Sequence, residues 1–245
     1  MLINVVFLYR KKRLNMVGKM RKVVILSGAG MSAESGIMTF RDMGGIWEQY
    51  NIEEVASPIA WQNSPQLVLD FYNQRRKQLM EVEPNTGHLA LVDLEQRYEL
   101  QIITQNVDNL HERAGSSKVM HLHGELMKVR SEVNEKLVYE LDHWELKLGD
   151  KAEDGNQLRP HIVWFGESVP MLEKAIPFVQ EADIIIIVGT SMQVYPAASL
   201  ISYSKTGAEL FYIDPNAEDY HYPNLKTITQ KAGEGLPLLV KQLLK

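Results

Sequence analysis

Four short clusters of glycine and polar residues each follow an apolar run, and they are the first candidates for chemistry. The earliest, Gly28-Ala29-Gly30, comes soon after Lys22–Leu26. Glycines after a strand let the backbone approach a phosphate group, and the N-terminus of a following helix favours its negative charge. Glycine turns also serve packing alone, so this cluster leaves both interpretations open. The other clusters are Gln105-Asn106, Gly189-Thr190-Ser191 and Asp214-Pro215-Asn216.

The runs before these clusters predict buried parallel strands, because they are unbroken and rich in β-branched residues. Helical segments between them predict an α/β fold with a Rossmann-like doubly wound parallel sheet, whose ligands bind at the carboxyl ends of the strands. In the first helix, Leu89 and Val92 share one side, which can also include Leu91. The expected strands are Lys22–Leu26, Leu100–Thr104, Asp183–Val188, Glu209–Ile213 and Leu225–Thr229, and the expected helices are Gly87–Gln96, Pro196–Ser204 and Gly235–Leu244.

Two stretches interrupt this alternation and predict a smaller inserted domain that faces the sheet. Residues 40–82 are expected to be helical, whereas residues 127–160 are polar and charged with little periodicity. Residues 1–20 are interpreted as an N-terminal extension, because their basic residues follow the apolar stretch, opposite to the order in a secretory signal. The main domain is therefore expected to span residues 21–245.

The composition narrows the classes of function. The chain has 245 residues, of which 45% are hydrophobic and 23% charged, enough for a sizeable core. A net charge of −5 disfavours a nucleic-acid-coating protein, and no apolar run approaches the roughly 20 residues of a membrane span. The absence of cysteine excludes disulfides, thiol catalysis and thiolate zinc sites. Without a usable signal peptide, we expect a cytoplasmic location.

Six blocks of sequence, taken together and in order, are far more specific than any one of them. They are Gly28-Ala29-Gly30-Met31-Ser32-Ala33-Glu34-Ser35-Gly36-Ile37 leading into Thr39-Phe40-Arg41, Thr104–His111, Leu122-His123-Gly124, Val163–Glu167, Gly189-Thr190-Ser191 and Tyr195–Ala198. Over about residues 21–240 the chain resembles the sirtuins, the NAD-dependent protein-lysine deacylases. The resemblance implies a Rossmann-like domain and a small domain, with NAD and the acyl-lysine of a protein or peptide meeting between them.

The resemblance also implies the residues that bind NAD. Phe40 would cover the nicotinamide ribose and Arg41 would contact phosphate; the alternative makes Phe40 a core residue and Arg41 a solvated charge. Asp108 would accept a hydrogen bond from the carboxamide, or it would simply cap a helix. Asp214 stands where the family usually has asparagine. The implied NAD-binding residues are Gly28, Ala29, Gly30, Ser32, Ala33, Phe40, Arg41, Gln105, Asn106, Asp108, Gly189, Thr190, Ser191, Asp214 and Ala232.

His123 is the candidate general base, with Asn106 and Asp108 completing the implied catalytic set. The ordinary pKa of histidine, about 6.5, suits proton transfer near neutral pH. The resemblance implies transfer of the acyl group to the ADP-ribose part of NAD with release of nicotinamide, which needs no metal and no protein nucleophile. His121 and His143 are given no role.

The implied substrate site has two parts. Val163, Phe165, Gly166 and Glu167 belong to the segment on which an extended peptide adds as a strand, a mode that selects little by side chain.

The second part, Ala56, Tyr72 and Arg75, resembles the pocket of the sirtuin class that removes succinyl, malonyl and glutaryl groups. Tyr72 and Arg75 share a helix face at spacing i, i+3 and can converge on one carboxylate. In the alternative, Tyr72 packs and Arg75 is a solvated charge, as we expect of Arg76 and Lys77.

The chain also departs from the family in the small domain, where most sirtuins hold zinc with four cysteines. Ser131 stands near the first expected ligand, and Asp142, His143 and Glu145 make an unconvincing substitute set. We therefore expect no zinc and a small domain held by packing. The residues expected to pack are Leu137, Val138, Tyr139, Leu141, Trp144, Leu146 and Leu148.

Two other functions stay open on the sequence. The same site could transfer ADP-ribose to a protein or hydrolyse NAD, or the chain could be a non-catalytic NAD sensor. Tyr72 with Arg75 favours deacylation over the first, and His123 argues against the second, because a sensor needs no base. We expect acylated lysines as partners, neither nucleic acid nor membrane, and a monomer as the favoured state.

Overall fold

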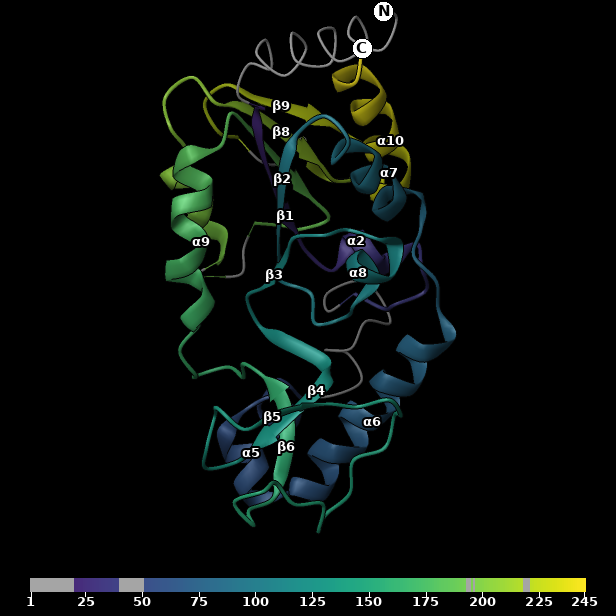
Figure 1. Ribbon diagram of the computed structural model, residues 1–245, viewed down its shortest axis with the longest axis vertical. Coiled ribbons are helices and arrows are strands. Elements are labelled where there is room, and N and C mark those ends of the chain that lie inside the picture. Colours follow the sequence, from purple (N-terminus) through teal and green to yellow (C-terminus); the bar gives the residue numbers. More distant parts are fainter. Residues whose placement is uncertain (1–19, 40–50, 193–194, 196, 218–220) are drawn as a thin grey trace, which may run out of the picture.

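The computed structural model describes residues 20–39, 51–192, 195, 197–217 and 221–245. Its larger sheet confirms the Rossmann-like expectation: six parallel strands lie in the order β3-β2-β1-β7-β8-β9 (Figure 1). The chain order reverses at β1, between β2 and β7, which is where such sheets bind ligands. The strands are β1 (Lys22–Ser27), β2 (Glu99–Thr104), β3 (Val119–His121), β7 (Ile184–Val188), β8 (Glu209–Ile213) and β9 (Leu225–Ile228).

Helices cover both faces of this sheet, so successive strand residues are buried on opposite sides. Ile25 of β1 packs in the core beneath α7 (Thr86–Leu94) and α10 (Ala232–Leu243). Its neighbour Val24 packs in the core beneath α9 (Pro170–Glu181) and the 3₁₀ helix η1 (Ala197–Tyr203). Within the described ranges, no helix combines the length and apolar character that a membrane crossing needs.

Two helix predictions need correction. In α7 the side that carries Leu89 is not the core side: Leu89 is half exposed, whereas Leu91 and Leu94 are buried. The segment expected as the helix Pro196–Ser204 is a 3₁₀ helix over Ala197–Tyr203, and Pro196 lies outside the described residues.

The stretch 127–160, expected to be irregular, contributes most of a second sheet. Its three antiparallel strands lie in the order β5-β4-β6 and form the lower part of Figure 1, beside α5 and α6. Trp61, Leu69 and Val129 share one core there. Residues 40–50 of the expected helical insertion lie outside the described residues. The elements are β4 (Gly124–Ser131), β5 (Val138–Glu140), β6 (Leu158–Ile162), α4 (Ile52–Val55), α5 (Pro58–Asn63) and α6 (Pro65–Glu81).

The packing expected in this smaller part is found for some of the seven apolar residues named for it. Leu146 is buried and Tyr139 and Leu141 pack against the same core, but Val138, Trp144 and Leu148 are exposed. The buried Ser131 hydroxyl instead donates to Asp154 Oδ2 at 2.7 Å. A hydroxyl held by a carboxylate does not fit the thiolate zinc site of the family. The described residues contain no group of three or more histidine, cysteine or acidic side chains placed to hold a metal ion.

Candidate active site

The glycine loop after β1 is hydrogen-bonded through its backbone to the end of β7 and the loop that follows it. Gly28 N donates to Val188 O at 3.0 Å, and Gly30 N donates to Gly189 O at 2.8 Å. A Cβ on Gly28 would lie 2.6 Å from Thr190 Cβ, and one on Gly189, whose φ is +61°, would lie 2.2 Å from Met31 N. Close packing of two strand ends therefore requires these glycines, and contact with phosphate stays a prediction.

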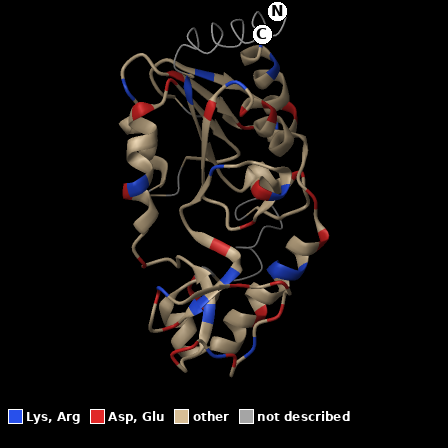
Figure 2. Cartoon of the chain, viewed as in Figure 1, with Lys and Arg blue, Asp and Glu red and all other residues tan. Residues whose placement is uncertain are grey.

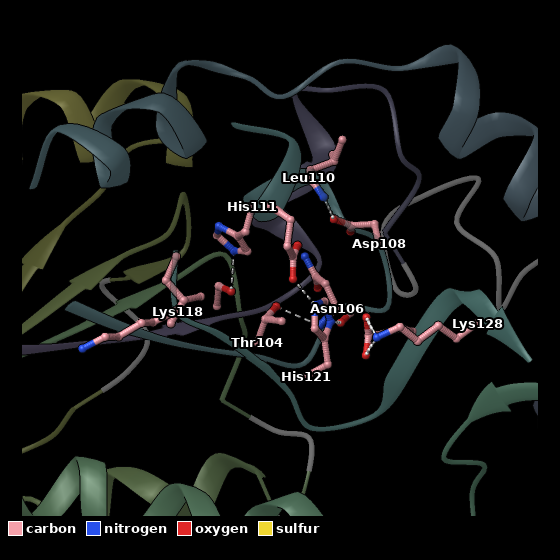
Figure 3. Close-up of polar contacts among 12 residues, drawn as sticks. Thr104, Asn106, Asp108, Leu110, His111, Lys118, His121 and Lys128 are labelled. Carbon is pink, nitrogen blue, oxygen red and sulfur yellow. Dashed lines mark hydrogen bonds and ion pairs between the residues drawn. The ribbon is translucent and has the colours of Figure 1, made fainter. Parts of the chain in front are cut away.

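Three of the predicted residues form one hydrogen-bonded network at the ends of β1 and β2. Ser32, in α2 (Gly30–Ala33), donates to Asp108 Oδ2 at 3.0 Å and accepts from Asn106 Nδ2 at 3.1 Å. Leu110 N donates to Asp108 Oδ1 at 3.1 Å, at the start of α8 (Leu110–Ala114; Figure 3). Burial raises the pKa of Asp108, while the hydrogen bonds from Leu110 N and the Ser32 hydroxyl oppose the rise. Asp108 therefore caps the start of α8 and also belongs to the hydrogen-bonded network with Ser32 and Asn106.

A pocket opens beside this network and brings α6 to it. Five of the predicted residues line it: Ala29, Ser32, Arg75, Asn106 and Asp108. Sequence reasoning missed the other lining residues, Ile37, Met38, Gln78, Leu79, Val107 and Leu126. Five of these six are apolar, and an apolar residue carries no signal that separates a pocket wall from the core. Phe40 and Arg41 lie outside the described residues.

His121 and His123 are two residues apart, and their pKa values are shifted in opposite directions. His123 Nδ1 lies 3.0 Å from Gln105 O, and since a carbonyl only accepts, Nδ1 carries the proton and Nε2 keeps its lone pair. Burial lowers the pKa of His123, so its neutral, basic form prevails. His121 faces two acceptors, Asn106 O at 2.9 Å and Glu112 Oε1 at 2.8 Å. Burial opposes its charge, but these bonds outweigh burial and raise the pKa of His121.

The remaining predicted NAD residues lie at the strand ends, outside the pocket lining. Gln105 Nε2 donates to Thr190 Oγ1 at 3.2 Å and so joins the ends of β2 and β7. Asp214 Oδ1 accepts from Asn216 N at 2.9 Å in the turn after β8. Ala232 is buried at the start of α10. Ser191 and Ala33 are exposed.

The backbone of the predicted peptide segment is hydrogen-bonded to the predicted base, His123, and to Ala56 of the predicted acyl pocket. Val163 N donates to His123 O at 2.9 Å, and Phe165 N donates to Ala56 O at 3.0 Å. The Phe165 side chain is 54% exposed, as a contact for a peptide requires. The Glu167 carboxylate turns inward, where it accepts from both terminal nitrogens of Arg159 at 2.9 and 3.2 Å.

Helix α6 presents two cations to different surroundings. Arg75 is half-buried at the pocket, close enough to Asp108 for their charges to interact. The expectation that Arg76 is a solvated charge is wrong, because its side chain is completely buried. It donates to Trp144 O at 2.7 Å and to Asn73 Oδ1 at 2.5 Å. The side chain thus joins α6 to the segment after β5.

Comparison with known proteins agrees with this layout. The Sir2 family model matches residues 28–196. A Helicobacter pylori protein named NAD-dependent protein deacylase is 57% identical over 229 residues, which cover 92% of this chain and 99% of that protein. A Bacteroides thetaiotaomicron protein of the same name is 54% identical over 231 residues, covering 92% and 98%. A solved Sir2 homologue complex with NAD superposes with a TM-score of 0.81 at 38% identity, covering 96% of this chain and 93% of that one.

Proposed function

The chain belongs to the Sir2 family, and we propose that it is an NAD-dependent protein-lysine deacylase that prefers acyl groups ending in a carboxylate. The observation that carries this preference is the position of Arg75. It contributes a cation to a pocket whose walls include Ile37, Leu79 and Leu126. A charged donor next to apolar walls favours an acyl chain with an apolar stem and an anionic end.

The residues around the pocket fit NAD. The loop after β1 and the network of Ser32, Asn106 and Asp108 lie at the point of the sheet where dinucleotides bind. Asn106 and Asp108 offer amide and carboxylate groups to the nicotinamide and its ribose. When bound, NAD supplies the ribose carbon to which the acyl oxygen is transferred as nicotinamide leaves.

In this proposal His123 moves the proton that the transfer requires. Its Nδ1–H bond to Gln105 O fixes the ring, so the Nε2 lone pair is the one that takes a proton from a ribose hydroxyl. The bond between Val163 N and His123 O holds the peptide segment beside the base. A substrate strand added along Val163 and Phe165 would thus deliver its lysine toward the same place.

Mass spectrometry with NAD and matched acetyl-, malonyl- and succinyl-lysine peptides tests the proposal. We expect the acidic peptides to react faster and Arg75→Met to lower the ratio of acidic to acetyl kcat/KM by about 10- to 100-fold, the effect of one charge-assisted bond. Lys77→Met, which removes an exposed cation from the same helix, is the control and should leave the ratio unchanged.

Two results would contradict the proposal in different ways. A preference for acetyl-lysine in wild type and in Arg75→Met would make the protein a general deacetylase. Consumption of NAD without any change in the peptides would move the function to NAD hydrolysis or ADP-ribosyl transfer.

A further inference from the structure

Trp164 separates the two parts of the predicted substrate site and contacts both. It stands between Val163 and Phe165, but its side chain is 2% exposed whereas that of Phe165 is 54% exposed. Phe165 lies in a turn in which Glu167 N donates to Trp164 O at 3.0 Å, so a peptide over the exposed Phe165 does not cover the buried Trp164 side chain. The indole points instead to α6, where Nε1 donates to the Tyr72 hydroxyl at 3.0 Å.

This bond determines what the Tyr72 hydroxyl does. An indole N–H can only donate, so the Tyr72 oxygen must accept from it. Burial raises the pKa of Tyr72 to about 12, which keeps the hydroxyl protonated at neutral pH. With one lone pair held by Trp164, the O–H bond is turned away from the indole. The Arg75 guanidinium lies close enough to this buried hydroxyl for the two groups to interact electrostatically.

An ion pair behind Trp164 fixes the indole. The Arg159 guanidinium lies 3.4 Å from the centre of the Trp164 ring, and Trp61 lies at 5.9 Å. Glu167 accepts from Arg159 and also from the Trp164 backbone N–H at 2.7 Å. Both the ring and the main chain of Trp164 are therefore held by one charged pair, Arg159 of β6 and Glu167 of the loop after it. Figure 2 shows basic residues, in blue, on the strands of this small sheet.

We propose that Trp164 is a specificity-determining residue that holds the Tyr72 hydroxyl as a donor toward the carboxylate of the acyl group. The proposal rests on the acidic-acyl preference inferred above, in which Tyr72 and Arg75 share the carboxylate, and adds the residue that orients the Tyr72 hydroxyl. Tyr72 and Arg75, from adjacent turns of α6, would both donate to one carboxylate. Trp164 of the peptide segment would set the orientation of the Tyr72 hydroxyl.

Kinetics of Trp164→Phe with succinyl- and acetyl-lysine peptides test it, because phenylalanine keeps an aromatic ring but loses the N–H. We expect a rise in KM for the succinyl peptide with a smaller change for the acetyl peptide, so that the ratio of kcat/KM falls about five-fold. In a Tyr72→Phe background the same substitution should add nothing to the ratio. Trp144→Phe, whose exposed ring lies against the Lys77 ammonium and not on Tyr72, is the matched control and should leave the ratio unchanged.

Each contrary outcome has its own meaning. An equal loss for both peptides would make Trp164 a packing residue only, and an effect that persists in Tyr72→Phe would exclude the hydroxyl as its route. If wild type lacks the acidic preference, the proposed function itself fails. If Arg75→Met abolishes the preference and Trp164→Phe does not change it, only the present inference fails.

A second measurement does not depend on the folding of Trp164→Phe. In the proton NMR spectrum, Tyr72→Phe should move the Trp164 indole N–H resonance upfield, and an unmoved resonance would overturn the inference.

Discussion

Replacement of Arg76 should show how much of the stability of the smaller part depends on one buried cation. Arg76 donates to Trp144 O, to Asn73 Oδ1 and, more weakly at 3.4 Å, to Leu126 O. Its two short bonds are worth about 1.5–3 kcal/mol each, since the donor is charged. Burial lowers the pKa of Arg76 to about 10, which sets roughly 3 kcal/mol against the charged form.

The balance predicts different costs for different substitutions. Arg76→Met keeps most of the packing and removes both the bonds and the buried charge, so the free energy of unfolding should fall by only about 1–2 kcal/mol. Arg76→Ala also loses the packing of the side-chain stem and should cost about 3–5 kcal/mol.

Urea unfolding of both variants, followed by tryptophan fluorescence, measures these costs. Lys174→Met removes an exposed cation from α9 and serves as the control, with an expected change within about 0.5 kcal/mol. If Arg76→Met were as stable as the control, the bonds would no more than balance the cost of burying the charge. The role of Arg76 in joining α6 to the small sheet would then be refuted.

Three other sites give predictions of their own. His123→Ala should still bind NAD but lose about 10²- to 10⁴-fold in turnover, as measured by calorimetry and nicotinamide release. Because the lowered pKa keeps His123 neutral to lower pH, the acid limb of wild-type kcat/KM should have its midpoint below about 6.5, and a midpoint above that value would contradict the assignment. Gly189→Ala places Cβ against backbone and should lower the melting temperature far more than Gly149→Ala, which has a similar positive φ but open space; equal losses would show that φ alone matters. Ser131→Ala should cost about 1–3 kcal/mol in urea unfolding by removing the bond to Asp154, whereas a chelator should not change the wild-type curve.

The central strands β1, β7 and β8 of the large sheet were predictable because they are buried on both faces, whereas the edge strand β3 was not among the expected strands. An unbroken run such as Ile184–Val188 is apolar at every position, so it is recognised as a buried strand. Parallel strands also bring their carboxyl ends to one edge of the sheet. The clusters there could therefore be grouped from sequence. The face of α7 could not, because Leu89, Leu91 and Val92 are all apolar and only packing against α10 decides which of them is buried.

The small sheet escaped prediction because two of its buried positions are charged. Arg130 and Arg159 lie in β4 and β6 and are almost fully buried, yet in the sequence they indicate a solvated surface. Their common partner Glu167 is contributed from outside both strands, at 3.5 Å from Arg130 and 2.9 Å from Arg159. The hydrophobic periodicity of a strand does not reveal a buried charge that is neutralised by a residue outside that strand.

The same reasoning explains why Arg75 and Arg76 could not be separated by sequence. Adjacent residues on a helix point about 100° apart, so Arg75 lines the pocket and Arg76 faces the Trp144 carbonyl in the segment after β5. Asn73 and Arg76 fix the helix, and under the proposed function Tyr72 and Arg75 would act on the acyl group from this fixed helix. Substitutions on the two faces should therefore couple, and the double variant of Arg76→Met with Arg75→Met should lose less acyl selectivity than the two single losses combined.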